Sequence, residues 1–165
     1  MENVPKFTYI KTPLNKYTFK VPKIRRWVEE FAEGRVLNLF AGLIKLDLDE
    51  VRNDIRESME ADYHLDALEF VKQYKGGEFN TILLDPPYSY RKSMEMYDGK
   101  VMSTFNAVKN ELSGILTDNG IVMTFGYHST VMGKSRGFEI EHICLMSHGG
   151  AIHDTIASIE RRIVV

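Results

Sequence analysis

The apolar run Thr81-Ile82-Leu83-Leu84 stops abruptly at Asp85-Pro86-Pro87-Tyr88, and this pattern predicts a buried parallel β-strand with a rigid end. Proline has no backbone N–H donor and imposes extended geometry on the residue before it, so we expect the strand to stop at Asp85. Open α/β sheets bind their ligands at the carboxyl ends of such strands. The chain is therefore expected to hold a ligand beside Asp85.

The residues after this strand offer acceptors and a flat ring. The carboxylate of Asp85 and the carbonyl of Pro86 are two acceptors with no competing donor on either proline, and Tyr88 adds an aromatic face. This combination suits a planar group with an exocyclic amino group, because each acceptor takes one amino hydrogen while the ring stacks. The alternative is a tight Pro-Pro turn with Asp85 facing solvent.

A second strand end is expected upstream, at Val36–Gly42, where a short apolar run finishes in small residues. Gly42 can adopt positive φ or let the backbone pass close to a ligand.

The tetrad Asp85-Pro86-Pro87-Tyr88 resembles the D-P-P-Y motif of S-adenosylmethionine-dependent amino-methyltransferases, above all the N6-adenine DNA methyltransferases. The resemblance implies an α/β fold: a Rossmann-like, mostly parallel sheet with a C-terminal antiparallel strand pair. The chain departs from the family over Leu43–Glu50, which is too short for an ordinary crossover helix, so shortened early crossovers are expected. The resemblance also implies S-adenosyl-L-methionine as cofactor. Asp85, Pro86, Pro87 and Tyr88 would form the catalytic site.

The same resemblance implies where the cofactor would bind. Matched residues of the family's glycine motif are Asn38, Leu39, Phe40, Ala41 and Gly42. Asn38 replaces the usual acid, and no second glycine follows Gly42.

Two further acidic residues are candidates for binding the cofactor. Asp54 lies near the end of a further strand expected at Val51–Ile55. A carboxylate at this position can accept hydrogen bonds from ribose hydroxyls; the alternative is a surface acid. Asp66 is expected to cap a helix running to about Tyr74. The resemblance adds that Asp66, with Ala67, would bind the adenine of the cofactor.

The remaining elements complete a single domain over residues 22–165, preceded by an extended arm over residues 1–21 that contains no regular element. Within that arm the resemblance suggests that residues 17–20 reach the methionine part of the cofactor. Helices are expected from Pro22 to Gly34 and over 103–116. Strands are expected at 61–65, 120–125, 138–146 and 156–165, with a polar aromatic lid over 89–99.

Composition limits the alternatives. The chain has 165 residues and a net charge of −2, so no global basic field favours nucleic acid. Basic residues nevertheless prevail from Lys6 to Arg35, which makes that part the better candidate for touching phosphates. The single cysteine excludes an internal disulfide, no metal site is expected, and no apolar run reaches the length of a membrane span. These features predict a cytoplasmic protein.

The most favoured function is methyl transfer to adenine N6 in DNA. An RNA base (guanine N2 or adenine N6) stays open as the substrate, because the chain has no room for the target-recognition domain of most sequence-specific DNA enzymes. If the substrate is DNA, a separate subunit could supply target recognition. A catalytically degenerate binding subunit is a second alternative. A nucleotide-binding dehydrogenase is disfavoured, because the G-x-G-x-x-G fingerprint is absent.

Overall fold

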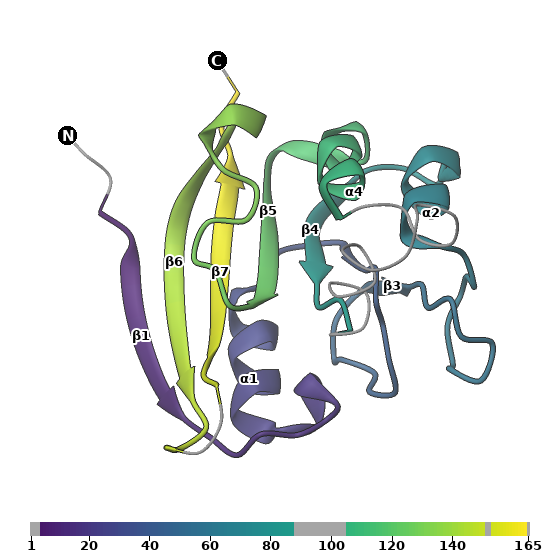
Figure 1. Ribbon diagram of the computed structural model, residues 1–165. Coiled ribbons are helices and arrows are strands. Elements are labelled where there is room, and N and C mark those ends of the chain that lie inside the picture. Colours follow the sequence, from purple (N-terminus) through teal and green to yellow (C-terminus); the bar gives the residue numbers. More distant parts are fainter. Residues whose placement is uncertain (1–3, 88–104, 151–152, 165) are drawn as a thin grey trace.

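The computed structural model describes residues 4–87, 105–150 and 153–164 and shows one twisted, mostly parallel sheet (Figure 1). In spatial order its strands are β1-β6-β7-β5-β4-β2-β3. Their bounds are β1 Lys6–Lys11, β2 Val36–Asn38, β3 Glu50–Arg52, β4 Phe79–Leu84, β5 Leu116–Gly126, β6 Phe138–Ser147 and β7 Thr155–Arg162. β7 runs antiparallel to both neighbours and the other pairings are parallel, which confirms the expected fold class.

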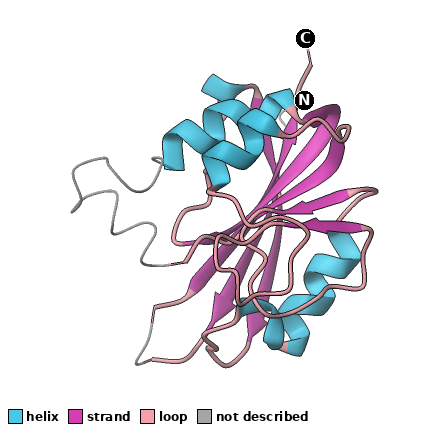
Figure 2. Cartoon of the chain, turned by 90° about the vertical axis from the view of Figure 1, so that its right-hand side faces the viewer, coloured by secondary structure: helices cyan, strands magenta, loops and turns pink. Residues whose placement is uncertain are grey.

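Helices cover both faces of the sheet (Figure 2). The α-helices are α1 Pro22–Phe31, α2 Ala67–Gln73 and α4 Phe105–Glu111, and the short 3-10 turns are η1 Thr18–Lys20, η2 Leu112–Gly114 and η3 Lys134–Arg136. Within the described ranges, no helix combines the length and apolarity that crossing a bilayer requires.

Strand β4 shows why the sequence of a central strand is almost wholly apolar. Leu83 packs in the core that contains α1, whereas Ile82 and Leu84 pack in the opposite core with α2 and α4. Each face needs its own apolar residues, because a parallel sheet is buried on both sides. The continuous run therefore becomes a central strand.

Helices α1 and α2 form where the sequence predicts them. Pro22 occupies the first turn of α1, where its missing N–H costs nothing, and Ile24, Trp27 and Val28 are buried. Asp66 caps α2, because its side chain accepts from the amides of Leu68 and Glu69. Both helices are thus set by local signals and by one apolar face.

The expectation of no regular element within residues 1–21 is wrong, because Lys6–Lys11 forms β1. This strand pairs in parallel with β6, from Lys6 opposite His142 to Lys11 opposite Ser147. Its sequence signal is weak because it is an edge strand: Phe7 and Tyr9 are 63% and 58% exposed. Pairing with β6, which is distant in sequence, stabilises what the local pattern does not.

The early strands are shorter than the sequence suggests. β2 ends at Asn38 rather than Gly42, and β3 spans Glu50–Arg52 rather than 51–55. The strand expected at 61–65 is reduced to one parallel bridge between Asn53 and Tyr63. Residues 39–49, which connect β2 to β3, contain no helix, in agreement with the expected shortened crossover.

A buried carboxylate holds the connection between β5 and β6. Glu160 is fully buried on β7, and its oxygens accept from the amides of Val131, Met132 and Gly133 at 3.1, 2.9 and 2.9 Å. This connection contains only η3 as regular structure. Side-chain hydrogen bonds fix the backbone where no α-helix does.

Replacing Glu160 by Ala is expected to lower the free energy of unfolding by about 3 kcal/mol, because three amides lose their acceptor. Chemical denaturation measures the loss. Glu78→Ala, at an exposed position, is the matched control and should change it by less than about 0.5 kcal/mol. Equal effects of the two changes would mean that Glu160 does not hold this connection.

Candidate functional site

A cavity of about 730 Å³ opens at the edge of the sheet where the parallel strands end. Segments distant in sequence meet there: the turn after β2, the residues after β3 and β4, the end of β5 and the link between β1 and α1. The predicted residues that line it are Leu39, Phe40, Ala41, Gly42, Asp54, Asp66, Ala67, Asp85, Pro86 and Pro87. Of the predicted site residues, Asn38 is absent from the lining and Tyr88 lies outside the described residues.

Asp85 leaves β4 directly into the cavity. Leu84 is fully buried, Asp85 is half-buried, Pro86 is buried and Pro87 is exposed. The chain thus passes from core to surface within four residues, and its one carboxylate lies at the transition.

The turn after β2 forms the floor of the cavity. Gly42 has a φ of +64°, which other residues rarely adopt, and the space where a Cβ would lie is open. The amide of Ala41 donates to the carbonyl of Asn53 at 2.9 Å, which ties this turn to the residue after β3. The expected need for glycine at position 42 therefore has a geometric basis.

Asn38 lies beneath the cavity rather than in its lining. It is fully buried at the end of β2, and its amide nitrogen donates to a carboxylate oxygen of Glu50 at 3.3 Å. Because Asn38 shares its side of the sheet with Glu50, its side chain reaches the neighbouring strand instead of the open edge. The structure does not bring this residue to the ligand position that the resemblance implied.

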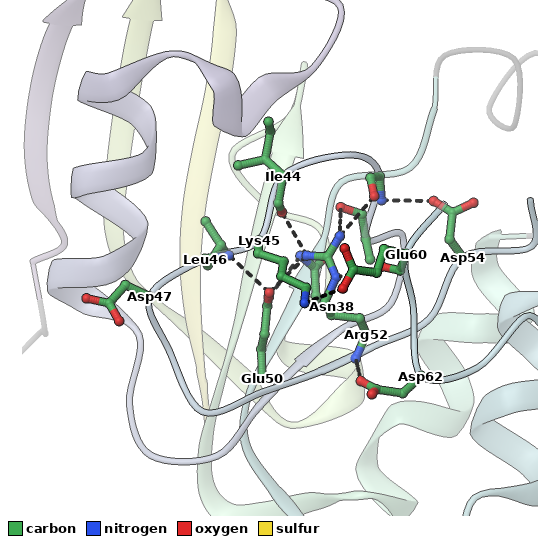
Figure 3. Close-up of polar contacts among 12 residues, drawn as sticks. Asn38, Ile44, Lys45, Leu46, Asp47, Glu50, Arg52, Asp54, Glu60 and Asp62 are labelled. Atoms are coloured by element: carbon green, nitrogen blue, oxygen red, sulfur yellow. Dashed lines mark hydrogen bonds and ion pairs between the residues drawn. The ribbon is translucent and has the colours of Figure 1, made fainter. Parts of the chain in front are cut away.

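A buried guanidinium organises the turn from below (Figure 3). Arg52 is 4% exposed, and its Nη1 lies 2.9 Å from Oε1 of Glu50. The guanidinium also donates to backbone carbonyls, at 2.7 Å to Ile44, 2.9 Å to Gly42 and 3.0 Å to Glu60. Arg52 thus joins the turn after β2 to the segment after β3.

Glu50 completes this network by accepting from the amide of Leu46 at 3.0 Å. Residues 39–49 contain no helix, so the contacts of Arg52 and Glu50 hold this connection in place of a crossover helix. Glu50 and Arg52 were not predicted as site residues, because their spacing of two residues on one strand is the only local signal.

Asp54 lines the cavity but is engaged by its own chain. Its Oδ2 accepts from the amide of Gly42 at 2.8 Å and from Nη2 of Arg56 at 3.0 Å. Its Oδ1 accepts from the amide and from Nε of Arg56, at 2.9 and 3.0 Å. A carboxylate has about four acceptor positions, so these contacts fill them.

The same contacts keep Asp54 ionised. Burial raises the pKa of its carboxyl, but the hydrogen bonds from Arg56 and Gly42 outweigh burial, so the pKa lies below its usual value. The lowered pKa stabilises the fold at neutral pH, and this contribution is lost as the pH falls through it.

Asp66 and Ala67 lie at the start of α2, on the wall of the cavity. The Asp66 carboxylate accepts from the amide of Leu68 at 3.1 Å, so the capping role is confirmed. Its assignment to a cofactor remains a prediction.

Other lining residues were only partly anticipated. Residues 14–19, between β1 and α1, line the cavity, whereas only residues 17–20 of this segment were predicted to reach the cofactor. Phe125, Gly126 and Tyr127 contribute the end of β5, and Asn53 anchors the floor by donating to the carbonyls of Leu39 and Leu65. Their proximity follows from strand order, which the sequence does not display.

No family model matches the sequence, and no curated protein matches it. Solved structures do match its fold. The chain is 10% identical to the N-methyltransferase NodS from Bradyrhizobium japonicum WM9, with a TM-score of 0.57 over 83% of this chain and 90% of that one. NodS has also been solved in complex with S-adenosyl-L-homocysteine.

Two further structures are similar. A candidate methylase from Haemophilus influenzae is 12% identical, with a TM-score of 0.54 over 86% of this chain and 87% of that one. The tRNA (uracil-54, C5)-methyltransferase from Pyrococcus abyssi is 13% identical, with a TM-score of 0.52 over 84% of this chain and 37% of that one. The chain therefore has the Rossmann-like fold of the methyltransferases.

Two variants at Arg52 and Glu50 should show separately how Arg52 affects the stability of the fold and how it affects the shape of the turn after β2. Arg52→Met leaves Glu50 charged and buried, so the free energy of unfolding is expected to fall by about 3–5 kcal/mol. Adding Glu50→Gln removes that charge and keeps an acceptor for Leu46, so most of the loss should be recovered in chemical denaturation.

Ligand binding should not recover in the double variant, because the carbonyls of Gly42 and Ile44 still lack their donor. We expect calorimetry to show affinity for S-adenosyl-L-homocysteine about tenfold below wild type, equivalent to about 1.4 kcal/mol. Wild-type affinity in Arg52→Met/Glu50→Gln would contradict this role of Arg52.

Proposed function

We propose that this chain transfers the methyl group of S-adenosyl-L-methionine to an exocyclic amino group of a nucleic-acid base, with adenine N6 in DNA as the favoured target. The observation that carries the proposal is the position of Asp85-Pro86-Pro87 at the end of β4, on the wall of the same cavity whose floor is the turn at Gly42. One wall thus offers acceptors for an amino group while the floor can hold a cofactor.

The cavity suits this cofactor in size and chemistry. Its volume of about 730 Å³ lies within the usual range for small-molecule sites. A Cβ on Gly42 would project into open space beside the floor, so glycine keeps that space free for a ligand. Leu39 to Gly42 would face the cofactor from below, and Asp66 would receive its polar groups. Asp54 would receive them only when Arg56 gives up its two side-chain hydrogen bonds.

The chemistry required of the chain concerns the nucleophile. The cofactor supplies an activated sulfonium methyl group, whereas an aromatic amine attacks poorly because its lone pair is delocalised into the ring. Asp85 and the Pro86 carbonyl would each accept a hydrogen bond from the amino group, and these two hydrogen bonds would favour a pyramidal nitrogen. This interaction is stronger in the transition state than in the ground state, as catalysis requires.

Tyr88 follows directly in the sequence and would stack on a base that is unpaired or flipped out of its helix. The preference for adenine in DNA rests on the complete D-P-P-Y tetrad. Guanine N2 or adenine N6 in RNA is the alternative target, and the fold is shared by the Pyrococcus abyssi tRNA enzyme.

A degenerate binding subunit is a second candidate, and two observations favour it. The acceptor positions of Asp54 are taken by Gly42 and Arg56, and Asn38 lies outside the cavity lining. Calorimetric titration with S-adenosyl-L-methionine separates the two functions, since only the enzyme requires the cofactor. Radiolabelled methyl transfer to DNA and RNA pools then identifies the substrate.

Asp85→Ala is expected to reduce methyl transfer by about 100-fold or more, because an acceptor for the reacting amino group is lost. Cofactor affinity should stay within about twofold of wild type, since Asp85 faces the substrate. Asp118→Asn, an exposed acid before the apolar part of β5, serves as the control with unchanged turnover. Retained transfer in Asp85→Ala would remove this residue from the chemistry.

Arg56→Met is expected to tighten cofactor binding by up to about fivefold. The side chain of Arg56 supplies two of the donors on Asp54, and a ribose diol needs the same two acceptor positions. Arg56 is 48% exposed, so the competing ion pair is worth about 1 kcal/mol at most. Arg25→Met on α1 is the control. Weaker binding in Arg56→Met would mean that Arg56 itself holds the cofactor.

A further inference from the structure

The link between β1 and α1 has lysines within it and at both of its ends, and one of them, Lys16, lines the cavity. β1 runs parallel to β6, so its carboxyl end reaches the edge of the sheet where the cavity opens. The chain then crosses this edge, and residues 14–19 form part of the lining. Exposed lysines lie at the two ends of this crossing, Lys11 on β1 and Lys23 on α1, and within it, at Lys16 and Lys20. These four residues are called the rim lysines.

These lysines form no ion pair within the described part of the chain, whose ion pairs all involve other residues. The Lys23 ammonium donates to the carbonyl of Lys11 at 3.0 Å, which brings the two ends of the crossing together. The Lys16 ammonium lies 5.6 Å from the centre of the Tyr17 ring, and both residues line the cavity. Their positive charge is therefore available to an external anion.

Lys23 lies in the first turn of α1, which contains no acid, and a cation there interacts unfavourably with the positive end of the helix dipole. The hydrogen bond from its ammonium to the carbonyl of Lys11 offsets part of this cost, and a bound anion would offset more of it.

Charge continues from the rim along the outside of the molecule. A second, shallower hollow is lined by Lys6, Lys23 and Arg26, together with one acid, Glu30, and the ring of Phe31. The opposite side of the cavity has Asp54 and Asp66 in its lining, with Arg56 paired to Asp54, and Glu57 and Asp62 are exposed beyond it. An extended polyanion would thus meet more unpaired positive charge on the side of the lysines.

We propose that Lys11, Lys16, Lys20 and Lys23 bind the phosphate backbone of the nucleic-acid strand whose base enters the cavity. The inference rests on the proposed function and adds to it the direction of the strand, over the β1–α1 crossing and toward Lys6 and Arg26. Lys16 and Tyr17 contact the strand nearest the base. The remaining lysines bind flanking phosphates without reading sequence.

The test compares two triple variants with the same loss of charge. The rim variant is Lys6→Gln/Lys11→Gln/Lys23→Gln, which leaves Lys16 in the cavity intact and also keeps Lys20, one of the residues expected to reach the cofactor. The matched control replaces exposed lysines elsewhere, as Lys72→Gln/Lys75→Gln/Lys134→Gln. Fluorescence anisotropy with a short labelled single-stranded DNA, and with the same sequence as RNA, gives the Kd over a series of salt concentrations.

Each phosphate contact on a single strand contributes about 0.7 to the slope of log K against log salt. Loss of three contacts should therefore make the slope shallower by about 2 and weaken binding by about tenfold to 100-fold near 0.1 M salt. The control should keep the wild-type slope. Calorimetry should show the same affinity for S-adenosyl-L-methionine in all three proteins.

Equal slopes for the rim variant and the control would overturn the proposal, as would a wild-type chain that binds neither strand. Binding of the wild type to vesicles of anionic lipid with no binding to nucleic acid would overturn it as well. The proposed function is tested separately. A wild type that binds nucleic acid through these lysines but transfers no methyl group would support the lysine contacts and contradict the enzyme. Methyl transfer by the wild type, together with an unchanged slope in the rim variant, would support the enzyme and contradict the lysine contacts.

Discussion

The cavity depends on the buried ion pair between Arg52 and Glu50. A guanidinium with almost no exposure is tolerated only when its donors are satisfied, and here they meet one carboxylate and several backbone carbonyls of two segments. Its partners include Gly42 and Ile44, so the pair fixes the turn that forms the floor of the cavity. The chain has no crossover helix there, and this network provides the rigidity that a helix would otherwise give.

The same device appears on the other side of the molecule. Glu160, fully buried on β7, accepts three backbone amides of the connection between β5 and β6. In both places a carboxylate on a strand replaces regular structure in a connection. Such a contact costs desolvation, which is offset because charge-assisted hydrogen bonds are stronger than neutral ones. Short connections and a complete sheet are compatible for this reason.

The polar groups around the cavity are unequally distributed, and this distribution links the fold to its proposed chemistry. Acids approach from β3, α2 and the end of β4, where amino and hydroxyl donors of small molecules can be bound. Lysines approach from the crossing between β1 and α1, where phosphates can be bound. The net charge of −2 does not display this separation, because it sums 21 basic and 23 acidic residues over the whole chain.

Local sequence determined much of this protein. The apolar run ending in Asp85-Pro86-Pro87 placed the central strand and the cavity wall, Pro22 and Asp66 placed two helices, and Gly42 marked the turn after β2. Each of these signals acts within a few residues, through proline geometry, side-chain capping or the conformational freedom of glycine.

Only the tertiary structure decided the rest. β1 forms because β6 pairs with it, Asn38 turns away from the cavity because Glu50 accepts its amide, and Asp54 is occupied because Gly42 and Arg56 lie beside it. Hydrogen bonds of this kind join residues whose distance is set by strand order and by turns. A pattern that is read along the chain contains neither, so the position of the lysines beside the cavity and the buried ion pair become visible only when the sheet is assembled.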